Sequence, residues 1–132
     1  MKRSAFPLLL LLLSSCEYFD YRVLTVNKLA SRVAVAAEPD TVPTYPSPGQ
    51  KEFFLRTAIA SGDSLALMQP GKYGWPQYLA GSRNHQLHLF IYPVDSILRY
   101  GHMDSVIRHR AYKRLTIDGA ELQQANWRVL LR

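Results

Sequence analysis

The sequence predicts a mainly β domain, antiparallel and sandwich-like, with two or three short helices; an α+β fold is the alternative. Three observations favour it. Several short runs alternate apolar and other residues with period two, and clusters of proline, glycine and serine separate these runs. The alternation of strands and long helices typical of parallel sheets is not visible. The chain has 132 residues, which corresponds to one domain at most.

Residues 1–15 have the form of a signal peptide. Lys2 and Arg3 make a positively charged start, and six leucines at 8–13 make a short apolar core. This core is much shorter than the ~20 residues that cross a bilayer as a helix. Removing 15 of the 132 residues leaves 117, and the loss of Lys2 and Arg3 lowers the net charge from +6 to +4.

The signal peptide ends in Leu13-Ser14-Ser15-Cys16, which resembles the bacterial lipobox of one aliphatic residue, two small residues and a cysteine. In proteins with this motif the chain is cut before the cysteine, which is diacylated, and the new amino group is usually acylated too. Several acyl chains anchor a protein stably, whereas one gives marginal binding. The alternative is an ordinary cleaved signal, but Cys16 is the only cysteine and stands where the motif requires it.

The resemblance implies that membrane lipid is a partner through Cys16 and that residues 16–20 are a lipidated tether. In Gram-negative lipoproteins an aspartate after the cysteine tends to retain the protein at the inner membrane. Here that residue is Glu17, which favours the outer membrane over the inner one.

Residues 21–132 are predicted to form the β-rich domain. Period-two runs at 21–27 and 32–36 predict two strands that pair as an antiparallel hairpin. Four of the eight prolines then fall within 38–50, which predicts an extended connection that follows a sheet edge and blocks edge pairing.

Residues 51–68 allow two interpretations. The preferred one is two short strands on either side of the turn Ser61-Gly62-Asp63, and the other is a helix through Phe54 and Ala58. A turn at 70–74 follows, and Pro76 suits the first turn of a helix.

The strongest strand runs over 87–92 and ends at Pro93. It is apolar on both faces, so we expect both faces to be covered. Asp118 and Glu121 have the spacing of a helix capping box, with Leu122 and Ala125 placed to pack inward. The other predicted elements are short helices at 96–100 and 103–112, a strand at 112–116 and a final strand at 127–131.

Four segments of the C-terminal half form a pattern: the strand 87–92 with its Asp95-Ser96 turn, a short helix at 103–108, the strand 112–117, and Asn126-Trp127 before the last strand. This pattern resembles a group of small uncharacterised lipoproteins common in Bacteroidetes. The likeness covers roughly residues 75–131. It departs from the group after Arg114, where the usual Tyr-Asp is missing. The resemblance implies a location and a fold, and it brings no activity.

No catalytic or metal-binding constellation stands out. The histidines are His85, His88, His102 and His109, and the first two, three residues apart on a loop and a strand, point to opposite faces. The segment 61–64 lacks a nucleophile elbow, and the chain has no phosphate-binding or dinucleotide-binding loop. We therefore predict no catalytic residue, no metal and no cofactor.

The densest basic run consists of Arg108, Arg110, Lys113 and Arg114. One interpretation is a solvated helix end, where cations suit the helix dipole. The other is a partner-binding patch for acidic envelope glycans, lipid headgroups or an acidic envelope protein. A net charge of +4 on an exported domain gives no reason to expect nucleic acid.

Aromatic residues suggest one further site. Tyr73, Trp75, Tyr78 and Tyr100 could form a sugar-stacking platform, but the preferred interpretation of Trp75, which stands beside Pro76, is a place in the core. The expectation for the whole chain is an envelope lipoprotein that acts as a binding or structural module and not as an enzyme. The competing hypothesis is a small exported hydrolase or metal-binding protein that uses the histidines.

Overall fold

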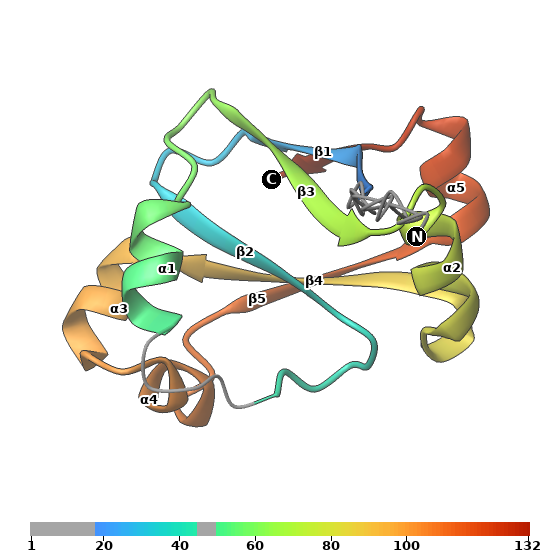
Figure 1. Cartoon of the computed structure of the whole chain (residues 1–132). Helices are drawn as coiled ribbons and strands as arrows, with labels where there is room; N and C mark the ends of the chain where they lie inside the picture. Colours follow the sequence, from blue (N-terminus) through green and yellow to red (C-terminus); the bar gives the residue numbers. More distant parts are fainter. Residues whose placement is uncertain (1–17, 45–49) are drawn as a thin grey trace, which may run out of the picture.

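The computed structural model describes residues 18–44 and 50–132, so the predicted signal peptide and Cys16 lie outside the described residues. Within these two ranges, six strands form two three-stranded sheets, and five short α-helices lie around them (Figure 1). The prediction of a mainly β, antiparallel-rich fold is confirmed, with more helices than expected. In the described part no helix is both long enough and apolar enough to cross a membrane.

The strands are β1 (Phe19–Asn27), β2 (Val33–Glu38), β3 (Ser64–Pro70), β4 (Gln86–Pro93), β5 (Lys113–Asp118) and β6 (Arg128–Leu131). The helices are α1 (Gln50–Arg56), α2 (Gly74–Gly81), α3 (Val94–Tyr100), α4 (Met103–Arg108) and α5 (Gly119–Gln124), with a short 3-10 turn at Arg83–His85. Sheet A has the order β3-β1-β6, with β1 antiparallel to β3 and parallel to β6. Sheet B has the order β2-β4-β5 and is antiparallel throughout.

The predicted hairpin of the first two strands is wrong. Both strands form, but β1 belongs to sheet A and β2 to sheet B. Asn27, which is fully buried, redirects the chain between them, because its side-chain amide donates to the carbonyls of Ser31 (2.8 Å) and Ile59 (2.9 Å). Both edges of β1 are already paired, one with β3 and the other with β6, so β2 cannot pair with it. The backbone N–H of Asn27 donates to the carbonyl of Asp63, the residue just before β3.

The preferred two-strand prediction for 51–68 is half wrong, because the first strand is a helix. Phe54, Leu55 and Ala58 pack together beneath sheet B, which is the spacing of one helix face. The ring of Phe54 lies 5.5 Å from that of Tyr92. The helix alternative is therefore correct as far as Arg56, where α1 ends before it reaches Ala58, and only the second strand forms, as β3.

The proline-rich connection does not follow an edge of the sheet. Its described part, 39–44, passes from the β2 side of sheet B to the β5 side. Arg83 donates its backbone N–H to the carbonyl of Pro39 (3.0 Å), and the guanidinium of Arg114 on β5 donates to the carbonyl of Thr41 (2.8 Å). The connection thus covers one face of sheet B.

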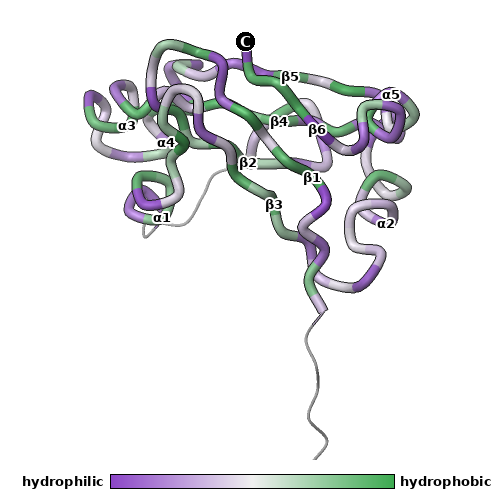
Figure 2. Tube along the Cα trace, turned by 90° about the horizontal axis from the view of Figure 1, so that it is seen from above, coloured by the Kyte–Doolittle hydropathy of each residue, from purple (hydrophilic) through white to green (hydrophobic). Residues whose placement is uncertain are grey.

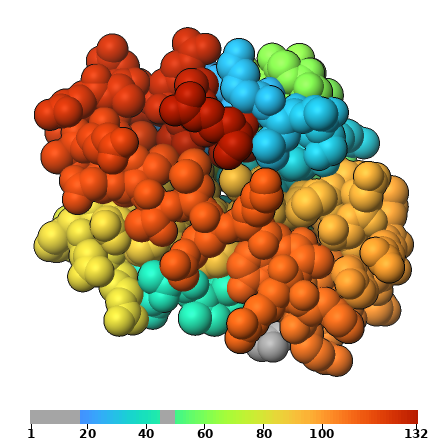
Figure 3. Space-filling model, turned by 180° about the vertical axis from the view of Figure 1, so that it is seen from behind, coloured from blue at the N-terminus to red at the C-terminus, as the bar shows by residue number. Residues whose placement is uncertain are grey.

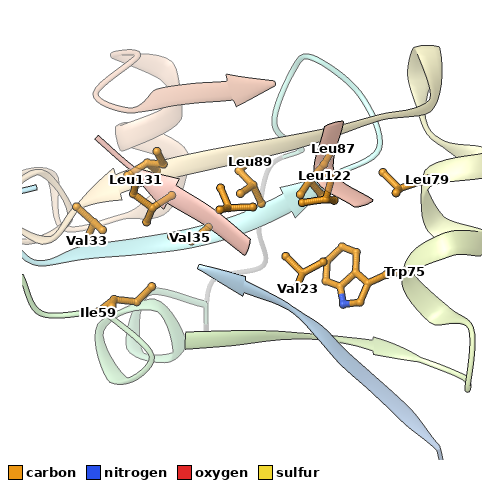
Figure 4. Close-up of a cluster of buried hydrophobic side chains, with 12 residues drawn as sticks. Val23, Val33, Val35, Ile59, Trp75, Leu79, Leu87, Leu89, Leu122 and Leu131 are labelled. Carbon is orange, nitrogen blue, oxygen red and sulfur yellow. The ribbon is translucent and has the colours of Figure 1, made fainter. Parts of the chain in front are cut away.

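Both faces of β4 are covered, as predicted. Leu87, Leu89 and Ile91 face the first core cluster, between the sheets, where Trp75 closes one end (Figure 4). Phe90 and Tyr92 face the second cluster, under α1, α3 and α4. Sheet B is therefore the central layer of the molecule, and its alternating strand explains the continuous apolar run in the sequence.

The end of α4 differs from the prediction, whereas the predicted cap of α5 is present. Helix α4 ends at Arg108 instead of continuing to 112, because the chain turns left-handed at Arg110 (φ 50°). Asp118 does cap α5, but its carboxylate accepts from the backbone of Ala120 (2.9 Å). Leu122 is buried as expected, whereas Ala125 is exposed.

Candidate functional site

The structure brings three of the four predicted basic residues together. Arg108 ends α4, Arg110 lies in the turn that follows, and Arg114 is on β5; all three line one hollow of about 470 Å³. Lys113 does not, because it pairs with Ile91 and therefore lies on the opposite face of the strand from Arg114. Figure 3 shows this side of the molecule, with the turquoise segment 39–44 beside the orange α4 and β5.

We call this site the arginine hollow; its lining residues are Thr41, Val42, Ile107, Arg108, Arg110, Tyr112 and Arg114. The arginines are held to different degrees. Arg114 is fixed by its hydrogen bond to Thr41, and Arg108 forms an exposed ion pair with Asp104 one turn earlier (3.5 Å). Arg110 forms no ion pair with any residue that the structure describes.

The charge of the arginine hollow is one-sided. Among the described residues, none that lines it is acidic. Each guanidinium presents planar donors that fit the two oxygens of a carboxylate or phosphate. Three such groups around one hollow make a site for an anion, with the apolar side chains of Val42 and Ile107 beside it.

A second hollow, of about 430 Å³, lies between α1 and the strands β2 and β3. Both strands are outer strands of their sheets, so backbone groups face the hollow without a neighbouring strand. Glu38 is its one charged lining residue in the described ranges. Burial raises the pKa of this carboxyl, and a hydrogen bond from Thr44 offsets part of the rise. One carboxylate selects a ligand less sharply than three guanidiniums do, so the arginine hollow is the stronger candidate.

The histidines do not converge. His88 is fully buried, with its ring nitrogens 3.3 Å from the hydroxyl of Thr116 and 3.2 Å from the carbonyl of Arg83. His85 is exposed, and His109 stacks on Tyr100. In the described ranges no three His, Cys, Asp or Glu side chains lie close enough to hold a metal ion.

The preferred interpretation of Trp75 as a core residue is confirmed, and the sugar-stacking alternative is not supported. Trp75 is a core residue, 1% exposed, and its indole N–H donates to the carbonyl of Leu67 (3.0 Å). Tyr78 packs edge-on against it, with its hydroxyl buried. Tyr100 stacks on His109 on the α3–α4 side, so only Tyr73 presents a free ring.

An exposed apolar surface lies where the described chain begins, and the sequence did not predict it. Phe19 and Asp20, assigned to the tether, are the first residues of β1. We call the surface the aromatic end; it consists of Tyr18, Phe19, Tyr21, Met68 and Tyr73. Three aromatic residues within five positions after the cysteine were the available signal, but their partners lie about fifty residues away on β3 and the following turn, which no local pattern shows.

No protein-family model, no curated protein and no solved structure matches this chain. A functional proposal therefore rests on the chemistry of the arginine hollow and on the sequence of residues 13–16, which resembles a lipobox.

Proposed function

We propose that the protein is a lipid-anchored binding module of the bacterial envelope, held at the outer membrane through Cys16, whose arginine hollow binds an acidic partner. The observation that carries the proposal is the convergence of Arg108, Arg110 and Arg114 on one hollow without a lining carboxylate among the described residues. The lipobox-like Leu13–Cys16 segment supports the anchor.

The surroundings of the hollow favour an acidic protein segment over the other anionic ligands. Val42 is 69% exposed at its rim, and the half-buried Tyr112 adds apolar surface. A peptide with an acidic residue beside an apolar one uses both features, whereas a uniformly polar glycan uses only the charge. Lipid headgroups fit poorly, because β5 and α4, which carry Arg114 and Arg108 of the hollow, lie toward the side opposite the start of the described chain (Figure 2).

The anchor is tested by changing Cys16 to alanine in the full chain. We expect the wild-type protein in the membrane fraction and the Cys16→Ala protein released from it, because the apolar core of the signal is too short to span a bilayer. A Ser15→Ala variant, which keeps a small residue before the cysteine, is the matched control. Unchanged membrane retention of Cys16→Ala would contradict the anchor.

The binding site is tested with two probes: a fluorescent peptide of alternating glutamate and leucine, and an oligogalacturonate. Arg110→Gln/Arg114→Gln removes two charges from the hollow, and Arg99→Gln/Arg132→Gln removes two exposed charges elsewhere. We expect the hollow variant to bind the peptide at least ~10-fold more weakly, because charge-assisted hydrogen bonds contribute ~1.5–3 kcal/mol each.

The control variant should lose less than about twofold, since distant exposed charges are largely screened. Equal losses in the two variants would show that only net charge matters and would contradict the site. Tighter, hollow-dependent binding of the oligogalacturonate would replace the peptide by an acidic glycan as partner.

A further inference from the structure

The aromatic end is unusually apolar for the surface of a soluble domain. Its five side chains are between 38% and 65% exposed. Single exposed apolar residues are normal on any surface, but a contiguous group marks a contact with a partner or a membrane. Tyrosine is also the side chain that combines an apolar ring with a polar tip suited to an interface.

Side-chain and backbone contacts link the segments that carry these five side chains. The hydroxyl of Tyr21 donates to the sulfur of Met68 (3.5 Å), and the rings of Phe19 and Tyr21 lie 6.3 Å apart. The carbonyl of Tyr18 accepts from the backbone N–H of Gly71 (2.6 Å), which holds the turn that carries Tyr73 beside the start of the chain. The surface is therefore assembled before any partner arrives.

A β-bulge in β1 produces the outward orientation. Asp20 pairs with Gln69 and Val23 with Leu67, so two residues, Tyr21 and Arg22, stand opposite Met68. Asp20 and Val23 are both buried, and the two residues between them both face outward. A regular strand would have turned one of the two inward.

The short separation of Tyr18 from Cys16 indicates that the aromatic end lies close to the membrane. Tyr18 follows Cys16 by two residues, which span at most ~7 Å even when fully extended. A lipid on Cys16 therefore brings Tyr18 into the headgroup layer, where aromatic side chains are favoured. Lys72, whose ammonium lies 5.6 Å from the ring centre of Tyr73, is placed to meet anionic headgroups.

We propose that the aromatic end lies in the membrane interface and fixes the orientation of the domain on the membrane. This inference rests on the proposed lipid anchor at Cys16. It also predicts which way the arginine hollow faces relative to the membrane. In Figure 2 the described chain begins at the bottom, while β5 and α4 lie toward the opposite side, so a domain seated on its aromatic end turns the hollow away from the lipid.

The test measures the depth of two single positions in the lipidated full chain. Met68→Cys is in the aromatic end, and Leu98→Cys, on α3, is the matched control; the wild-type side chains are 51% and 58% exposed. Cys16 carries its lipid through sulfur, so each variant has one free thiol for a nitroxide label. The protein is reconstituted in vesicles of phosphatidylethanolamine and phosphatidylglycerol, and collisions of the label with oxygen and with a water-soluble nickel chelate are compared.

We expect an oxygen-to-nickel collision ratio severalfold higher at position 68 than at position 98, because oxygen concentrates in the apolar layer and the chelate stays in water. Equal ratios on protein that floats with the vesicles would contradict the membrane seat and leave the anchor intact. Protein that fails to float would contradict the anchor itself. The two failures are therefore distinguishable.

Discussion

The two functional regions each contain an aspartate–arginine pair, and the pairs are built differently. At the aromatic end, Asp20 is buried and accepts from Arg22 at 2.9 Å and from the backbone of Trp75 at 3.0 Å. Beside the arginine hollow, Asp104 and Arg108 are exposed and lie 3.5 Å apart. The buried Asp20 also joins β1 to the start of α2 through Trp75, whereas the exposed pair joins two turns of one helix.

The difference shows that the aspartate of one region is fixed within the fold, whereas the arginines of the other, the proposed binding site, are exposed. Burial raises the pKa of the Asp20 carboxyl, but the hydrogen bonds from Trp75 and Arg22 outweigh it and hold the pKa below its ordinary value. The ionised carboxylate is thus part of the folded structure. The arginines of the hollow are exposed to solvent, so they are available to an incoming anion at little structural cost.

The largest expected effect comes from removing each aspartate in turn. Asp20→Ala leaves the buried N–H of Trp75 and the Arg22 guanidinium without their acceptor, so we expect the free energy of unfolding to fall by ~2–3 kcal/mol. Asp104→Ala removes only an exposed pair and should change it by less than ~0.5 kcal/mol. Urea denaturation of both variants measures the difference. Similar losses of unfolding free energy in the two variants would contradict the proposed difference between the Asp20 and Asp104 ion pairs.

Acid should remove the contribution of the Asp20 carboxylate to stability. Because the pKa of Asp20 is lower in the folded than in the unfolded chain, its contribution is present at neutral pH. That contribution is lost as the pH falls below the ordinary value of 3.8 toward the lower folded pKa. Asp20→Asn, which keeps an oxygen acceptor, should flatten this part of the curve of unfolding free energy against pH. A curve as steep as that of the wild type would show that another group is responsible.

The smallest expected effect is on the stability of the hollow variant. Arg110→Gln/Arg114→Gln should change the free energy of unfolding by less than about 0.5–1 kcal/mol, because Arg110 has no ion pair in the described ranges and Arg114 makes one exposed hydrogen bond. Thermal unfolding followed by circular dichroism provides the measurement. A larger loss would mean that the arginines hold the 39–44 segment in place and are not free for a ligand.

Local patterns in the sequence were sufficient for part of the fold. The apolar run of β4, the proline at the start of α2 and the capping aspartate of α5 each act within a few residues, so they could be predicted. The sheet switch at Asn27 could not, because it depends on Ile59, thirty-two residues away. Residues 51–56 were ambiguous because Phe54 packs on Tyr92, a contact that no local periodicity specifies.

The candidate site shows the same limit. A basic run is visible in the sequence, and the left-handed turn at Arg110 and the strand register then divide it, with Lys113 on one face and Arg114 on the other. The segment 39–44, which closes the hollow, comes from a distant part of the chain. Spacing alone identifies candidate residues, and long-range packing decides which of them share a site.

The most direct test of the account is the intact mass of the protein extracted from the membranes of a Gram-negative host that expresses the full chain. We predict a chain that begins at Cys16 and carries a diacylglyceryl group on sulfur and an acyl group on the new amino terminus. This result would place the aromatic end two residues from the lipid. An unmodified chain with a free cysteine thiol would contradict the anchor, and with it the orientation that places the arginine hollow away from the membrane.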